Sequence, residues 1–253
     1  SKSVKVKNSM LLGMRAVIEP TQNLKFEIVK TSQWGGDGQT KNLSSFGAAI
    51  AGNTNEKQHA NINQMAGFGI SYLTNIKKTP TKFYAQIIGE DEAGNLPSCF
   101  INLFGSELQF TPGKLFSSIG IELVDTRISR SSNGNCGANS AYNNSVYSYT
   151  HNGRVLGALI DTEGKSIGIS ISTNIFGDND IDFSIKNLVI NDKNWSDHRL
   201  SSSKASGLIA DIETSLQFAS YNIRSKLSYN NIYLNKVDYK NGLSLNLNVE
   251  YAF

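Results

Sequence analysis

The chain ends in Leu243-Ser244-Leu245-Asn246-Leu247-Asn248-Val249-Glu250-Tyr251-Ala252-Phe253, and this stretch decides the predicted fold. Its odd-numbered residues are all apolar, whereas its even-numbered residues are polar except for Ala252. Because a β-strand turns successive side chains to opposite faces, the segment would have one apolar face and one polar face. Soluble β-sandwiches also contain such strands, so the interpretation depends on whether the pattern recurs.

The same alternation recurs upstream. In residues 167–175 isoleucines alternate with small polar residues and glycine, and residues 181–185 and 208–218 alternate in the same way. Transmembrane β-barrels are built from such segments, with apolar side chains toward lipid and polar ones toward the lumen. Asp211 and Glu213 would lie on the polar face, where a water-filled lumen hydrates both carboxylates. The pattern therefore favours an antiparallel transmembrane β-barrel.

The remaining elements follow from turn residues and apolar runs. Pro20-Thr21-Gln22-Asn23 predicts a hairpin turn between two strands. A short helix is predicted at 43–51 within a polar stretch, and a second long polar loop at 127–144. The other predicted strands are 10–19, 24–34, 65–74, 82–90, 99–109, 115–126 and a less regular, bulged one at 223–237. About twelve strands result, and an even number suits a closed antiparallel barrel in a single domain, residues 1–253.

Composition excludes several other classes. The chain has 253 residues, 39% of them apolar, and no apolar run approaching the roughly 20 residues of a spanning helix. A net charge of +3 with scattered Lys and Arg makes nucleic acid an unlikely partner. Cys99 and Cys136 are as compatible with two free thiols as with a disulfide. The start at Ser1 lacks a signal-peptide pattern, so we expect a mature or truncated form of an exported protein.

Four blocks in order resemble the Wzi family of outer-membrane proteins, which help to assemble and attach group 1 capsular polysaccharide. The blocks are SQWGGDG (32–38), YAQIIGEDEAG (84–94), AYNNSVY (141–147) and YTHNGRVLG (149–157). The final strand closing on Phe253 also resembles the C-terminal signal read by the outer-membrane insertion machinery. The family has a larger barrel plugged by helical elements, so this chain resembles about its C-terminal half. It is expected either to be truncated, lacking an N-terminal portion, or to be a shortened relative.

The resemblance implies a lectin-like protein at the cell surface that binds capsular or extracellular polysaccharide without catalysis, cofactor or metal. Its partners would be that polysaccharide, outer-membrane lipid and the insertion machinery, and no nucleic acid. Where family members often have His after Tyr-Asn, this chain has Asn144, which puts the role of that imidazole in doubt.

Polar and aromatic residues in the two long loops supply the chemistry that sugar recognition needs, because amides and carboxylates bind hydroxyl pairs and aromatic faces cover the C–H side of a ring. The predicted sugar-binding residues are Gln33, Trp34, Asp37, Asn143, Tyr147, Tyr149, His151 and Arg154. Arg154 could also pair with a uronate carboxylate through its two-pronged guanidinium.

Simpler interpretations compete with these assignments. Trp34 and Tyr147 are more typical of aromatic girdle residues, and the glycines Gly35, Gly36 and Gly38 indicate a turn with positive φ. The acids Glu90, Asp91 and Glu92 indicate a solvated cluster at the rim, with a Ca²⁺ site as the alternative.

Two alternative functions remain open. A general diffusion porin would have a polar lumen and conduct in planar bilayers. An outer-membrane phospholipase would use a Ser nucleophile with His and Asn, and Ser131, Ser132, Asn133 and His151 supply those residue types, although on separate segments.

Overall fold

The computed structural model describes residues 6–52, 61–93, 96–113, 115–128, 136–137, 139–176 and 179–251, with the backbone alone at 91–93, 96 and 176. It is an all-β structure with one short helix among these residues. The elements are β1 (Met10–Thr21), β2 (Leu24–Trp34), α1 (Leu43–Ala51), β3 (Asn63–Ile76), β4 (Thr79–Ala93), β5 (Leu96–Phe110), β6 (Ser117–Asp125), β7 (Thr150–His151), β8 (Arg154–Val155), β9 (Lys165–Phe176), β10 (Asn179–Ile190), β11 (Ala205–Phe218), β12 (Tyr221–Asn230) and β13 (Gly242–Tyr251). The predicted helix at 43–51 is confirmed with the same bounds.

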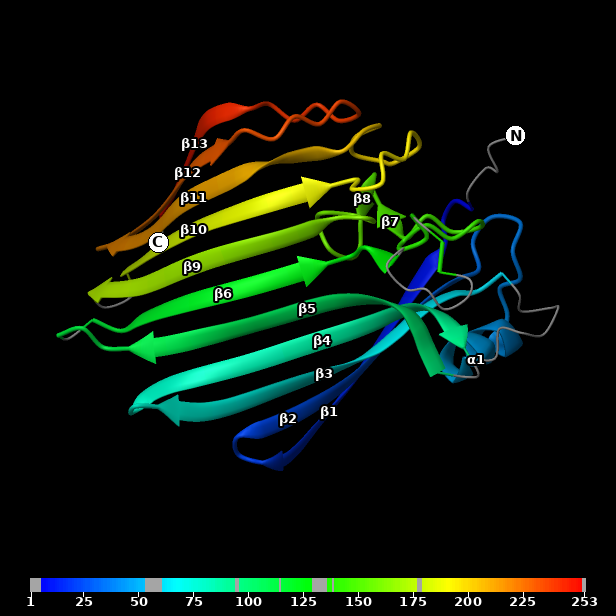
Figure 1. Cartoon of the computed structure of the whole chain (residues 1–253), viewed down its shortest axis with the longest axis horizontal. Helices are drawn as coiled ribbons and strands as arrows, with labels where there is room; N and C mark the ends of the chain where they lie inside the picture. The colour runs from blue at the N-terminus through cyan, green and yellow to red at the C-terminus, as the bar shows by residue number, and fades with distance from the viewer. Residues whose placement is uncertain are drawn as a thin grey trace. The chain divides into compact units, whose positions relative to one another are not determined.

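Eleven of the strands form one antiparallel sheet, and β7 with β8 forms a separate two-stranded ribbon. The order in the large sheet is β1-β2-β3-β4-β5-β6-β9-β10-β11-β12-β13, so each strand pairs with its neighbour along the chain (Figure 1). The predicted all-β antiparallel class is confirmed. Among the described residues the sheet has eleven strands rather than an even number, and β1 and β13 therefore run in the same direction.

The chain divides into two compact units, although the sheet continues through both. Unit 1 comprises residues 1–70, 86–102 and 126–163, and unit 2 comprises 71–85, 103–125 and 164–253. The assignment of residues 1–253 to a single domain stays a prediction. No helix among the described residues is long and apolar enough to cross a membrane.

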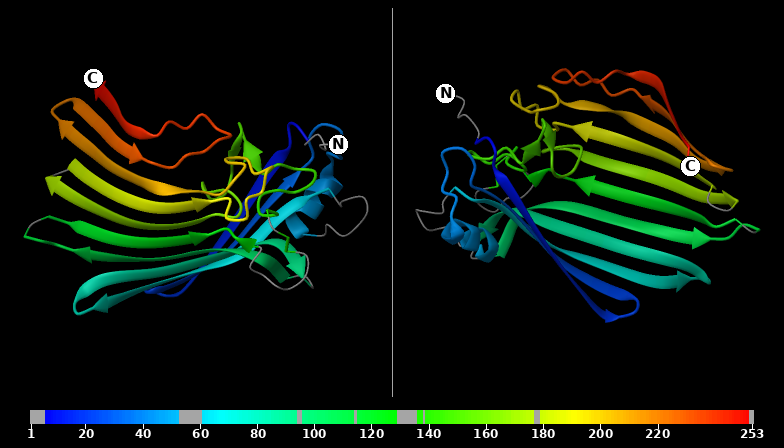
Figure 2. Two further views of the ribbon diagram at one scale, coloured as in Figure 1. Left: turned by 45° about the horizontal axis from the view of Figure 1, so that its top comes forward. Right: turned by 180° about the vertical axis from the view of Figure 1, so that it is seen from behind.

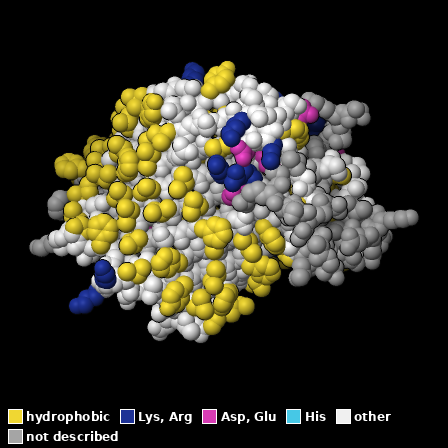
Figure 3. Space-filling view, viewed as in Figure 1, with side chains coloured by type: hydrophobic (Ala, Val, Ile, Leu, Met, Phe, Trp, Pro, Cys, Tyr) yellow, Lys and Arg dark blue, Asp and Glu magenta, His cyan; other side chains and the backbone are white. Residues whose placement is uncertain are grey.

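The strands of unit 2 separate apolar from polar side chains, as the alternation predicts. Ile171 of β9 lies in register with Ile119 of β6 and Phe183 of β10. On the opposite face, Asp182 of β10 lies in register with Glu213 of β11. Hydrophobic side chains gather in broad exposed patches (Figure 3). An apolar patch of this extent marks an interaction surface, and a lipid-facing barrel wall has this character.

The last strand, β13, also carries its apolar side chains on one face, and these side chains are strongly exposed. The side chains of Leu243 and Leu247 are 72% and 64% exposed, so they do not lie in a dry interior against a second sheet. Phe253, at the end of the predicted insertion signal, lies outside the described residues. The described part of β13 therefore fits an outward-facing apolar strand.

In unit 2 the connections at the two ends of the strands differ in length. Residues 77–78 and 219–220 make two-residue turns at one end. The longer connections 191–204 and 231–241 lie at the other end, because alternate connections of an antiparallel meander occupy opposite ends. Bacterial barrels have short periplasmic turns and longer extracellular loops, and this chain has the same asymmetry.

Exposed aromatic side chains accompany the short-turn end of unit 2. They are Phe110, Phe116, Phe218, Tyr221 and Tyr251, and each lies within or next to the end of a strand. The rings of Tyr221 and Tyr251, in register across β12 and β13, lie 5.1 Å apart between centroids. Aromatic residues at this level are typical of the girdle where a barrel wall meets the membrane interface.

The predicted bulged strand at 223–237 is wrong beyond residue 230. β12 ends at Asn230, and the chain then leaves the sheet because Asn231 closes it off: its backbone N–H donates to Leu208 O at 3.1 Å and its Oδ1 accepts from Leu208 N at 2.6 Å. The apolar side chains of Ile232 and Leu234, which suggested a strand, are buried within a folded connection instead.

A charge placed on the apolar face tests the two-faced interpretation. We expect Ile171→Arg to destabilise the folded protein by about 2–4 kcal/mol, because the side chain would face lipid. The matched variant Ser172→Arg should cost far less, since Ser172 lies on the polar face in register with Asp182. Urea unfolding of each variant folded into lipid vesicles measures the difference. Equal losses for the two variants would contradict a lipid-facing position for Ile171.

Candidate functional site

The loops of unit 1 gather at the end of β2. The segment 35–52, which contains α1, and the β7–β8 ribbon both lie near this strand end (Figure 2). Gly35, Gly36 and Gly38 follow β2 with φ of 61°, 96° and 74°, which confirms the predicted positive-φ turn. A Cβ on Gly36 would lie 2.7 Å from Lys7 O, so this turn also needs glycine for the close approach of the preceding segment.

Helix α1 is fixed by caps and by side chains from β2. The Asn42 side chain accepts from Ser45 N at 2.8 Å, and Ser45 Oγ accepts from Asn42 N at 3.0 Å, which together make a capping box. At the other end, Ser32 Oγ of β2 donates to Ala49 O at 2.8 Å. The helix thereby holds Phe46 against Trp34, with 5.5 Å between the ring centroids.

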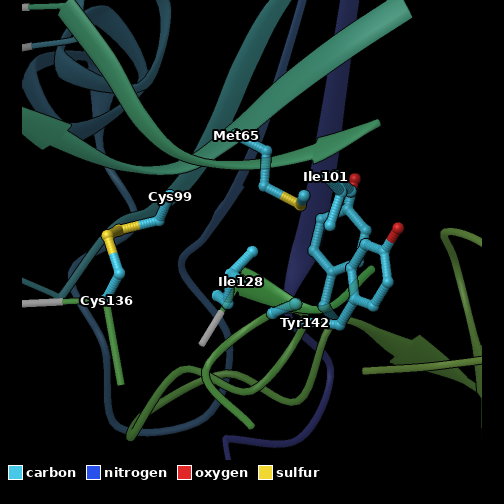
Figure 4. Close-up of a cluster of buried hydrophobic side chains, with 8 residues drawn as sticks. Met65, Cys99, Ile101, Ile128, Cys136 and Tyr142 are labelled. Atoms are coloured by element: carbon cyan, nitrogen blue, oxygen red, sulfur yellow. A yellow bond between two sulfur atoms is a disulfide. The ribbon is translucent and has the colours of Figure 1, made fainter. Parts of the chain in front are cut away.

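A small hydrophobic core joins the connection between β6 and β9 to strands β3 and β5. Met65, Ile101 and Ile128 converge on Tyr142, with a disulfide beside them (Figure 4). The disulfide joins Cys99 to Cys136, whose Cα atoms are 5.4 Å apart, so the two cysteines are paired. Closing a loop of 37 residues is expected to stabilise the fold by about 3–4 kcal/mol through the entropy of the unfolded chain.

Two tyrosines at the centre of this core have unusual backbone conformations. Tyr142 and Tyr149 have φ of 59° and 35°, in the left-handed region that bulky residues rarely adopt. Their rings stack at 5.8 Å between centroids, and the Tyr142 hydroxyl accepts from Ala158 N at 3.2 Å. Burial raises the pKa of both hydroxyls, so both phenols stay protonated at neutral pH. The stacking of the two rings and the hydrogen bond from Ala158 N therefore stabilise the strained backbone conformation at Tyr142 and Tyr149.

Gln33 connects this loop to the sheet. Its side chain is buried, and Oε1 accepts from Tyr149 N at 3.0 Å and from Asn63 Nδ2 at 3.5 Å. The Tyr149 hydroxyl bonds Thr31 Oγ1 at 2.7 Å, two residues earlier on β2. Gln33 and Tyr149 were predicted to contact sugar; in the fold, they bind the connection 126–163 to the end of β2.

A small, half-open cleft of about 50 Å³ lies beside Trp34 and Tyr147. Both side chains are buried, at 8% and 1% exposure, which is not the environment of girdle residues at a lipid interface. The Tyr147 hydroxyl donates to Gly35 O at 3.1 Å. The cleft is lined by Trp34, Gly35, Gln39, Thr40, Ser45, Asn61, Ile62 and Tyr147.

The sequence interpretation missed most of this lining. Gln39 and Asn61 are the amide side chains of the cleft, and Asn61 Nδ2 donates to Gln39 Oε1 at 2.9 Å. They are 22 residues apart in a polar stretch without periodicity. The block motif around Trp34 pointed to the correct neighbourhood, but only the folded connection brings the two amides together.

Asp37 and Asn143 lie in turns away from this lining. The Asp37 carboxylate accepts both bonds from Asn8 Nδ2, at 3.2 and 3.1 Å. Asn143 Nδ2 donates to Asn139 O at 3.1 Å, and Asn144 Oδ1 accepts from the backbone of Val146 and Tyr147. Asn144 thus positions the backbone that carries Tyr147.

His151 and Arg154 face each other across the β7–β8 ribbon, on either side of the Asn152-Gly153 turn. Both side chains are exposed, and His151 Nε2 lies 3.3 Å from Asn152 Nδ2. The structure thus brings these two predicted residues together at a hairpin tip.

The acidic cluster is only partly described. Glu90 lies in β4 and is half-buried, where its charge contributes to raising the pKa of Tyr142 and Tyr149, whereas the side chains of Asp91 and Glu92 lie outside the described residues. Ser131, Ser132 and Asn133, considered for hydrolysis, also lie outside them. In the part of the chain that the structure describes, no group of three or more His, Cys, Asp or Glu could hold a metal ion.

Replacing Gln33 tests whether it connects the loop to the sheet. Gln33→Leu would leave the buried Tyr149 N–H without its acceptor, at a cost of about 1–3 kcal/mol. We expect faster hydrogen exchange in a peptide containing Tyr149 and unchanged exchange in β10 and β11. Gln109→Leu, a half-buried amide of β5, is the control. Unchanged exchange at Tyr149 would show that Gln33 does not anchor the loop.

Comparison with solved structures gives one similar fold. It is Wzi of Escherichia coli, described as an outer-membrane protein involved in group 1 capsule assembly and a carbohydrate-binding β-barrel. The match has a TM-score of 0.71 at 22% identity and covers 97% of this chain and 50% of that one. The two proteins therefore share a fold, and this chain spans about half the length of the solved one.

Sequence comparison supports the same relationship. An uncharacterized 55.8 kDa protein in the cps region of Klebsiella pneumoniae is 34% identical over 128 residues, which cover 50% of this chain and 25% of that protein. The family model for the capsule assembly protein Wzi matches residues 1–247, nearly the whole sequence. The chain belongs to the Wzi family of capsule assembly proteins.

Proposed function

We propose that this chain is part of an outer-membrane, lectin-like protein that binds capsular or other extracellular polysaccharide and helps to attach or assemble it at the cell surface. Membership of the Wzi family supports the role in capsule assembly. The fold shared with a carbohydrate-binding β-barrel supports the outer-membrane location and the ligand class. The role is binding without catalysis.

The cleft beside Trp34 carries the proposal. The amides of Gln39 and Asn61 offer both donors and acceptors, as pairs of sugar hydroxyls require, and Thr40 and Ser45 add hydroxyl groups. Trp34 and Tyr147 contribute aromatic edges at its wall. The predicted residues Gln33 and Tyr149 would act indirectly, by fixing the backbone of the loop that forms one side of the cleft.

The β7–β8 ribbon offers a second contact with the same polysaccharide. His151 and Arg154 are exposed on neighbouring strands of the ribbon. A guanidinium binds a carboxylate through two parallel hydrogen bonds, so Arg154 suits an acidic sugar. Asp37 and Asn143 are more peripheral, because each is engaged in its own turn.

The sheet would supply the membrane partners. Its apolar face, with exposed residues such as Ile171 and Leu247, would contact outer-membrane lipid. The short turns would then lie toward the periplasm and the long connections toward the cell surface. The C-terminal strand, closing on Tyr251 and Phe253, would be read by the insertion machinery.

Removing the two cleft amides tests the function. We expect Gln39→Ala combined with Asn61→Ala to weaken binding of the capsular polysaccharide from the producing strain by roughly tenfold, because each amide hydrogen bond contributes about 0.5–1.5 kcal/mol. Affinity electrophoresis of the full-length protein measures the binding.

The control is Asn248→Ala, which removes an exposed amide that donates to Glu250 Oε1 at 3.0 Å on β13. This variant should bind like the wild type. Wild-type protein that conducts ions in planar bilayers but binds no polysaccharide would contradict the proposal and favour a diffusion porin.

A further inference from the structure

In unit 2, the connections 191–204 and 231–241 form one ordered layer of loops. The Asn235 side chain accepts from Ser202 N at 2.8 Å and donates to Ser202 Oγ at 2.8 Å. One residue on, Lys236 N donates to Leu200 O at 3.2 Å, and Lys236 Nζ bonds Ser196 O. These contacts join the two connections directly, over strands that Figure 2 shows ending on the same side.

Each connection is also fixed by further contacts. The buried Asn191 side chain bonds Trp195 N, Trp195 O and Ser201 O at 2.7–2.9 Å, which closes the first connection around one amide. In the second, Ile232 packs so closely over Gly207 that a Cβ there would lie 2.7 Å from the Ile232 Cα. The entropy of ordering these segments is therefore already lost in the free protein.

One aromatic side chain of these two connections, that of Tyr233, is exposed rather than packed in the protein interior. Tyr233 is 72% exposed, although its neighbours Ile232 and Leu234 are buried at 1% and 9%. The ring is thus held outward on a fixed backbone. Tyrosine supplies a large, rigid contact area at low entropic cost, and it is enriched among residues that dominate binding.

The surroundings of Tyr233 are aqueous rather than lipid. Lys236, Asp238 and Lys240 follow within seven residues, and all three are exposed. Burial, and then the charge of Asp211, raise the pKa of the Tyr239 hydroxyl. A charged side chain that faces lipid is energetically costly, so this segment is expected to lie in water, beyond the membrane-spanning part of the strands.

From these contacts we infer that Tyr233 is a second polysaccharide-contact platform, separate from the cleft of unit 1, on which the C–H face of a pyranose ring stacks. The inference rests on the proposed function, because it takes the same polymer as its ligand. A polymer bound at two places on one protein gains affinity through effective concentration. The loop layer would therefore strengthen retention of long chains more than binding of short fragments.

The test compares Tyr233→Ala and Tyr233→Phe in the full-length protein, with capsular polysaccharide from the producing strain as the probe. Loss of the ring should weaken binding on the order of tenfold, whereas phenylalanine keeps the stacking surface and should bind within about twofold of wild type. Tyr221→Ala, an exposed tyrosine at the short-turn end, is the matched control and should bind normally. Thermal unfolding of each variant confirms that it is folded.

Wild-type-like binding by Tyr233→Ala, with the cleft variant still impaired, would overturn the platform and leave the proposed function standing. Equal weakening by the alanine and phenylalanine variants would also overturn it, because stacking would then not be the interaction. If wild-type protein bound no polysaccharide, the proposed function itself would fail.

Discussion

Antiparallel backbone pairing sends alternate side chains to opposite faces of the sheet, and the rest of the structure depends on that constraint. In unit 2 the register places isoleucine beside isoleucine and phenylalanine across β6, β9 and β10, while serine, glycine and charged residues share the other face. A one-residue slip in any strand would exchange the two faces. Such a slip would turn polar side chains toward the apolar face and apolar side chains toward the polar face. The register of the strands is therefore strongly specified.

The loops are organised by a different kind of interaction. Side-chain amides order the long connections: the buried Gln33 holds the Tyr149 backbone, the buried Asn191 closes one loop of unit 2, and the exposed Asn235 joins two of them. A buried amide that loses its partner costs more than the bond contributes when made, so Gln33 and Asn191 are points of high specificity. Fixed loops can present exposed side chains such as Asn61 and Tyr233 to a ligand with little further entropic cost.

Most of the sheet was predictable because its signal is local. Alternation located the strands, turn chemistry located the hairpin at residues 22–23, and the run 43–51 located the helix. The strand at 223–237 failed because buried Ile232 and Leu234 imitate alternation outside a sheet. The site was harder: Trp34 and Tyr147 were identified through motif blocks, whereas the disulfide partners and the pair Gln39–Asn61 depend on contacts between distant segments. Burial of Gln33 and Tyr149, which converts predicted ligands into anchors, has no sequence signature.

A structure of the full-length protein with a bound fragment of its polysaccharide would locate the binding site. We expect saccharide density at the long-connection end of the strands, with hydroxyl groups within hydrogen-bond distance of Gln39 and Asn61. Density confined to the short-turn end, or to the polar face of the strands away from these connections, would contradict this expectation.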